Sequence, residues 1–146
     1  MSLHVSAILK RKGSAVVTID ADASFQAAID KLAEHNIGAL VVTSDGRTPE
    51  GIISERDLVR QLAGSGQDAA QRRVRDFMVT EVRTCSLETT LDELMALMTE
   101  RRIRHIPVMD QGALCGIVSI GDVVKSRLDE LEVRSKSLEQ YVTGTP

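Results

Sequence analysis

A chain of 146 residues with a net charge of only −3 lacks the strongly basic balance of a typical nucleic-acid-binding domain. Its apolar content of 42% and charged content of 27% exclude a disordered or fibrous protein, and one Tyr and two Phe leave little aromatic surface for base stacking. No apolar run approaches the ~20 residues of a membrane span and no signal-peptide pattern opens the chain, so we expect a cytoplasmic protein without a membrane partner.

The first half of the chain alternates between strand-like and helix-like patterns. β-branched runs bounded by turn residues predict strands, and apolar residues at helical spacing predict helices. A stretch rich in Gly and Ser at 64–68 predicts a linker. The expected elements before it are a strand at 14–19, a helix at 25–33, two hairpin strands at 40–42 and 51–53, and a helix from Leu58.

The second half repeats this order. The expected elements are a strand at 82–85, a helix at 91–98, two hairpin strands at 106–108 and 114–118 that turn at 110–112, and a final helix. That helix carries an apolar stripe made of Val124, Leu128, Leu131, Leu138 and Val142, interrupted by Ser135. Such a stripe is expected either to contact a partner helix or to fold back on the body of the protein.

The two halves are also related residue by residue. The segment Gly51–Val59 returns as Gly116–Val124 after a shift of 65 positions. The sequence therefore predicts an α+β fold of two β-α-β-β-α repeats, packed around a pseudo-twofold axis and sharing one core, with a C-terminal helical extension. Residues 5–9 are expected to open the first repeat and residues 74–78 the second. The predicted boundaries are 1–66 for the first repeat, 67–128 for the second, and 129–146 for the C-terminal helical extension and tail.

Each repeat places a Ser and an Asp three positions apart where a strand passes into a helix. Ser54 with Asp57, and Ser119 with Asp122, fit the capping box that satisfies the first free N–H groups of a helix. A carboxylate held at this position can also accept hydrogen bonds from the two hydroxyls of a ribose, and free N–H groups at a helix start suit a phosphate. Capping and ligand binding are compatible interpretations.

From about Val5 to Leu128 the chain resembles a stand-alone tandem pair of cystathionine-β-synthase-type (CBS) domains, also called a Bateman module. The residues that carry the resemblance are Gly51–Asp57, Gly116–Asp122 and Arg104–Val108. It implies a non-enzymatic regulatory protein that holds an adenosine-containing ligand in clefts between the repeats. AMP is the first choice, with ATP, ADP, NAD and S-adenosylmethionine as the others. The resemblance further implies a homodimer and a separate effector protein, and it implies no catalytic cofactor.

The resemblance also assigns roles to particular residues. Asp57 and Asp122 would hold the ribose, beside Ser54 and Ser119. Residues that would read the adenine edge are Thr18, Ile19, Asp20, Thr84, Cys85 and Ser86, and those that would line its faces are Ala39, Leu40, Ile106 and Pro107. The candidates for phosphate contact are Arg56, Arg104 and His105. Ile120 and Gly121 complete the second Ser-Asp motif. The first repeat lacks the Arg-His pair and the Pro, so we expect the Asp122 cleft to be occupied more readily than the Asp57 cleft.

Other classes of function are weighed beside this one. A ligand-independent adaptor would use the C-terminal helix as its working surface. A nucleic-acid-binding protein would use the basic cluster at 101–104, but the low net charge argues against a nucleic acid partner. The sequence nominates no pairing of a nucleophile with a base, and its His and Cys residues lack metal-ligand spacing, so we expect neither an enzyme nor a metal site. Cys85 and Cys115 are expected to be inert buried thiols.

Overall fold

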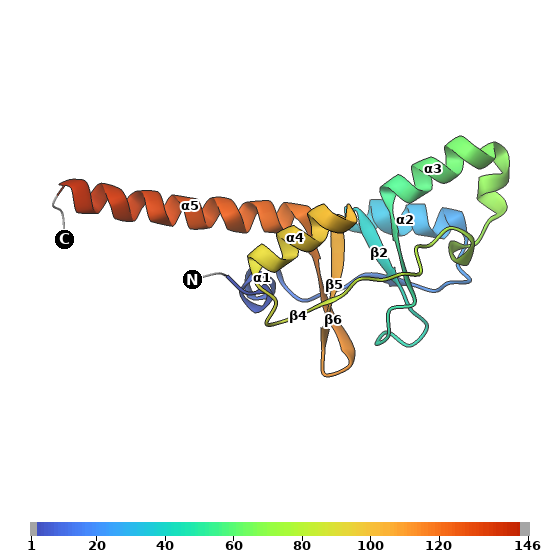
Figure 1. Cartoon of the computed structure of the whole chain (residues 1–146). Coiled ribbons are helices and arrows are strands. Elements are labelled where there is room, and N and C mark those ends of the chain that lie inside the picture. The colour runs from blue at the N-terminus through green and yellow to red at the C-terminus, as the bar shows by residue number, and fades with distance from the viewer. Residues whose placement is uncertain (1–2, 144–146) are drawn as a thin grey trace.

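The computed structural model describes residues 3–143 and arranges them as two units of the same build (Figure 1). The first unit consists of β1 (Thr18–Ile19), α2 (Phe25–His35), β2 (Ala39–Val42), β3 (Gly51–Ser54) and α3 (Glu55–Ser65). The second consists of β4 (Cys85–Ser86), α4 (Leu91–Arg101), β5 (His105–Asp110), β6 (Ala113–Ser119) and α5 (Ile120–Thr143). The predicted β-α-β-β-α order is confirmed in both units.

Each unit contains one three-stranded sheet of the same topology. In the first, β1 runs parallel to β2 and β2 antiparallel to β3; in the second, β4, β5 and β6 repeat that arrangement. The registers also correspond, since Leu40 faces Ile53 in one sheet and Ile106 faces Val118 in the other. The predicted α+β class with two repeats is thus confirmed, although the opening strands are shorter than expected.

Local sequence signals explain where the two central helices begin and end. The Ser24 hydroxyl caps α2 by accepting a hydrogen bond from the N–H of Ala27, and Thr90 caps α4 in a capping box with Glu93. Each helix buries an apolar face at helical spacing. The buried residues are Phe25, Ala28 and Leu32 in α2, and Leu91, Leu94 and Met98 in α4.

The two units exchange their opening segments. Helix α1 (Val5–Lys12) belongs to the core of the second unit, into which it inserts Val5, Ile8 and Leu9. The N–H of Val5 donates to the carbonyl of Thr89 over 2.9 Å. Each sheet and its helices are therefore covered by the segment that precedes the other unit. Two separate cores form as a result, instead of the single shared core expected. Residues 5–9 likewise complete the second repeat and do not open the first.

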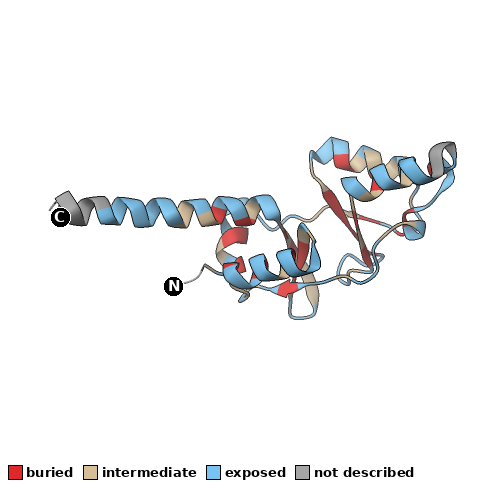
Figure 2. Cartoon of the chain, turned by 45° about the horizontal axis from the view of Figure 1, so that its top comes forward, coloured by how far each residue is buried: buried red, intermediate tan, exposed pale blue. Residues whose placement is uncertain are grey.

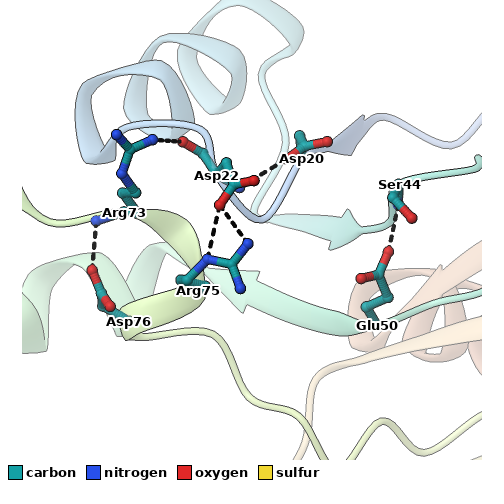
Figure 3. Close-up of polar contacts among 7 residues, drawn as sticks. All are labelled: Asp20, Asp22, Ser44, Glu50, Arg73, Arg75 and Asp76. Carbon is teal, nitrogen blue, oxygen red and sulfur yellow. Dashed lines mark hydrogen bonds and ion pairs between the residues drawn. The ribbon is translucent and has the colours of Figure 1, made fainter.

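The segment between the units makes the reciprocal contact. It contains two 3₁₀ helices, η1 (Gly66–Gln71) and η2 (Val74–Asp76), so the predicted linker at 64–68 is helical. Val74 is fully buried in the core of the first unit. Figure 3 shows how polar contacts hold this segment there: Arg73 donates to the carbonyl of Asp22 over 2.7 Å, and Arg75 pairs with the Asp22 carboxylate.

Helix α5 extends well beyond the body of the protein, on the side away from the first unit (Figure 1). It is continuous through Ser135, and every side chain from 131 to 138 is exposed (Figure 2). Val124, Leu128, Leu131 and Leu138 of the predicted stripe are all exposed, and the side chain of Val142 lies outside the described residues. Within residues 3–143, no helix is both long and apolar enough to cross a membrane.

Candidate functional site

The two strand-to-helix junctions form the predicted capping boxes. At the start of α3, the N–H of Ser54 donates to Oδ2 of Asp57 over 2.8 Å, and the N–H of Asp57 donates back to the Ser54 hydroxyl over 3.4 Å. At the start of α5, Ser119 and Asp122 make the same two bonds over 2.8 and 3.2 Å. Both carboxylates are therefore held in equivalent, fixed orientations by their own helices.

A close approach between the units positions these junctions beside each other. The start of each helix is bonded to the residue before a strand of the same unit: the N–H of Glu55 donates to the carbonyl of Gly38, and the N–H of Ile120 donates to that of Arg104. Gly38 also faces the imidazole of His105, which lies 3.4 Å from where a β-carbon on residue 38 would stand. The start of β5 therefore packs against residue 38, beside the Asp57 junction, at a spacing that a β-carbon would also fit.

A cleft of about 860 Å³ lies at this junction, a size typical of small-molecule pockets. It is lined from three parts of the chain: the first unit, the segment that precedes β4, and the turn from α4 into β5. The lining residues are Gly38, Ala39, Ile52, Ile53, Ser54, Glu55, Arg56, Asp57, Val59 and Arg60; Val79, Glu81, Val82 and Arg83; and Arg102, Ile103, Arg104, His105 and Pro107. We call it the Asp57 cleft.

The Asp57 cleft gathers some of the residues that the resemblance assigned to a ligand. Those in its lining are Ala39, Ser54, Arg56, Asp57, Arg104, His105 and Pro107. The first unit's missing Arg, His and Pro are therefore supplied at this cleft by the second unit. The assigned residues outside this lining are Thr18, Ile19, Asp20, Leu40, Thr84, Cys85, Ser86, Ile106, Ser119, Ile120, Gly121 and Asp122.

Some of the residues outside the lining have clear structural roles. Leu40 and Ile106 are fully buried, one in each core. The Asp20 carboxylate accepts a hydrogen bond from the N–H of Asp22 over 2.8 Å in the turn before α2 (Figure 3). Cys85 is buried, which raises the pKa of its thiol to about 12, and Cys115 is half-buried and also free. Cys85 is therefore inert at neutral pH, as expected.

Sequence reasoning missed several charged residues of the cleft. Arg60 lies four positions after Arg56 on α3, so helical spacing could have placed both side chains on one face. Arg83 belongs to the exchanged segment and Arg102 to the turn after α4. No local pattern brings these two residues to Asp57, because their position depends on how the units pack.

Asp122 is in a different electrostatic environment from Asp57. Lys12, at the end of α1, donates from Nζ to Oδ2 of Asp122 over 2.6 Å and to the carbonyl of Ile117 over 2.9 Å. Burial alone would raise the pKa of Asp122, but the hydrogen bonds from Lys12 and Ser119 outweigh it, and the pKa lies below its ordinary value. Asp122 is therefore ionised and neutralised by the protein's own ammonium group.

Asp57 has no such cation. Met78 packs against Gly51 as Leu9 packs against Gly116, so Met78 is the counterpart of Leu9. Three residues further along, Glu81 takes the place that Lys12 has in the first segment. Across the described residues, Asp57 forms no salt bridge and only its Oδ2 accepts a protein hydrogen bond. Burial lowers the pKa of His105 across the cleft, and Lys12 lowers it further, so this imidazole is neutral at pH 7. The cleft thus presents the fixed Asp57 carboxylate with a free oxygen, the carboxylates of Glu55 and Glu81, a neutral imidazole and five guanidinium groups.

Comparisons with known proteins agree with this architecture. A mitochondrial CBS domain-containing protein of Arabidopsis thaliana is 35% identical to this chain, over 98% of the chain and 73% of the relative. The crystal structure of a CBS-domain containing protein from Agrobacterium tumefaciens is 46% identical, with a TM-score of 0.82 over 85% of this chain and 98% of that one. A hexameric CBS-CP12 protein from cyanobacteria is 28% identical, with a TM-score of 0.74 over 85% of this chain and 67% of that one.

The family model for the CBS domain matches the chain twice, at residues 5–64 and 74–129. CBS domains form regulatory modules that generally bind adenosine-containing ligands. With two matched repeats, two equivalent sheets and two equivalent capping boxes, this chain belongs to the CBS-domain family.

Proposed function

We propose that this protein is a non-enzymatic regulatory module that binds an adenine nucleotide in the Asp57 cleft. The observation that carries the proposal is the pairing of an unneutralised carboxylate at a helix start with basic groups from the other unit, in one cleft of about 860 Å³. The ligand is an adenosine compound of the set that the resemblance implies: AMP, ADP, ATP, NAD or S-adenosylmethionine.

The lining supports a definite division of roles. Asp57 accepts hydrogen bonds from the ribose hydroxyls through its free oxygen, with the Ser54 hydroxyl beside it. Ala39 and Pro107 are buried apolar residues in the cleft wall and provide contact for the flat faces of adenine. The groups that take the phosphate are Arg56 and Arg104, whose guanidinium forks suit phosphate oxygens, and the neutral imidazole of His105, which can donate one hydrogen bond.

A ligand in this cleft would act by favouring one arrangement of the two units. Because the lining is drawn from both units, a bound nucleotide stabilises the arrangement in which they are close together. The exposed stripe on α5 provides a surface through which a homodimer or a separate effector protein would respond. In a cytoplasmic setting such a module would report on the energy state of the cell.

The test is isothermal titration of the purified protein with AMP, ADP, ATP, NAD and S-adenosylmethionine. Saturable binding of one of them supports the proposal and identifies the ligand. Absence of binding by all five would contradict it and favour the adaptor function of α5. The nucleic-acid alternative has less support, since Arg102 and Arg104 of its basic cluster line the cleft.

Removal of the Lys12 ammonium is expected to change the stoichiometry of binding. Because Lys12 neutralises Asp122, the wild-type chain binds one nucleotide, at Asp57. In the Lys12→Met variant, which removes the ammonium group and keeps an unbranched side chain, the Asp122 carboxylate is released and a second, weaker site opens. Titration calorimetry measures the number of sites per chain, and Lys10→Met, at an exposed position of α1, is the control. Two sites in the wild-type chain would contradict the closure of the Asp122 site.

A further inference from the structure

Five arginines surround the Asp57 cleft: Arg56, Arg60, Arg83, Arg102 and Arg104. Throughout residues 3–143, none of the five forms a salt bridge with a carboxylate. Arginines elsewhere in the chain do find such partners, since Arg11 pairs with Asp129, Arg75 with Asp22, and Arg127 with Asp92 and Glu130. The cleft therefore concentrates guanidinium groups whose charge the protein does not balance.

The charge of the lining confirms a local surplus. Its carboxylates are those of Glu55, Asp57 and Glu81, and His105 is neutral at pH 7, so five positive charges face three negative ones. The chain as a whole carries a net charge of −3. An acidic protein that gathers unpaired arginines around one cavity presents a strongly favourable site for a ligand with several negative charges.

The arginines also reach the cleft from different segments of the chain. Arg56 precedes Asp57 directly, whereas Arg60 stands one turn further along α3, about 5 Å away along the helix axis. Arg104 precedes His105 at the start of β5, whereas Arg102 lies two residues further out, in the turn after α4. Arg83 comes from a third segment, the one before β4. Three segments of the chain therefore bring arginines to the same cleft.

A single phosphate has too few oxygens to engage all of them. One guanidinium fork takes two phosphate oxygens, so two arginines already satisfy a terminal phosphate. We propose, on the basis of the nucleotide assignment above, that the ligand carries a chain of two or more phosphates, as in ADP and ATP. Arg56 and Arg104 take the phosphate next to the ribose, and Arg60, Arg83 and Arg102 take the outer ones. This replaces AMP, the choice that the sequence alone favoured.

The experiment is a calorimetric series with adenosine, AMP, ADP and ATP at constant ionic strength, on the wild-type protein and on Arg60→Gln and Arg83→Gln. We expect ATP to bind at least about ten times more tightly than AMP, because each added phosphate gains charge-assisted hydrogen bonds. Each variant is expected to lose about ten- to a hundredfold in ATP affinity and less than about twofold in AMP affinity. The control is Arg101→Gln, which removes an exposed arginine beside Arg102 that does not line the cleft.

The outcomes separate this inference from the function on which it rests. Equal affinities for AMP and ATP would overturn the polyphosphate assignment and leave the nucleotide function intact, as would an equal loss of AMP and ATP binding in the variants. Absence of binding by all four compounds would overturn the nucleotide function itself. Inorganic tripolyphosphate is the last probe: if it bound as tightly as ATP, the adenosine part of the site would be wrong.

Discussion

Asp57→Ala is expected to lower the affinity for the nucleotide by roughly 1.5–3 kcal/mol, which corresponds to about 10- to 150-fold. The variant removes the only lining carboxylate that is fixed by a capping box and is not neutralised by a cation. The ribose hydroxyls would then lose a charged hydrogen-bond acceptor. Titration calorimetry with the tightest ligand of the series measures the loss directly.

Asp122→Ala is the matched control for this experiment. It removes a carboxylate with the same capping bonds, so both variants lose a similar helix cap of about 1 kcal/mol. Nucleotide affinity in Asp122→Ala is expected to stay within about twofold of the wild-type value, since Asp122 does not line the cleft. The reverse result, with binding lost in Asp122→Ala and kept in Asp57→Ala, would mean that the ligand binds at Asp122, as the sequence motifs alone suggested.

Ile8→Ala is expected to destabilise the protein by about 2–5 kcal/mol, the range for truncating a large buried aliphatic residue. Ile8 is 1% exposed and packs in the core of the second unit, although it lies at the N-terminal end of the chain. Urea unfolding gives the change in the free energy of unfolding. Lys10→Ala, on the exposed face of the same helix, is the control and is expected to change stability by less than about 0.5 kcal/mol.

Hydrogen exchange would show which unit the Ile8→Ala variant weakens. Because α1 packs against the second core, we expect faster amide exchange in β5 and β6, while β2 and β3 keep most of their protection. Faster exchange in β2 and β3 instead would mean that α1 stabilises the first unit, as its position in the sequence suggests.

Local sequence patterns were sufficient for the elements and their caps. Phe25, Ala28 and Leu32 mark the buried face of α2, and the Ser-Asp pairs mark the starts of α3 and α5; each depends on neighbours within a few residues. The exchange of opening segments was not predictable in this way. Residues 5–9 and 74–78 both carry apolar side chains that can cover a core, and only the packing of the complete chain decides which core each one covers.

The residues of the candidate site could also be predicted only where a local motif marks them. The Ser-Asp motifs and the Arg-His pair pointed to Ser54, Asp57, Arg104 and His105, which all line one cleft. Arg83 and Arg102 carry no motif, and they converge on Asp57 only because the two units pack together. The pairing of Lys12 with Asp122 was equally hidden, since it depends on α1 crossing to the second unit. Together these contacts made the Asp57 cleft, and not the Asp122 junction, the better candidate.

The exchanged segments also determine how this protein could be divided. A fragment ending near residue 66 would carry α1 without the core that α1 fills, and would lack Val74, which its own core requires. A fragment beginning at residue 67 would lack Val5, Ile8 and Leu9 in the same way. Half of the chain is therefore not expected to fold on its own, because each half lacks apolar residues that its core requires.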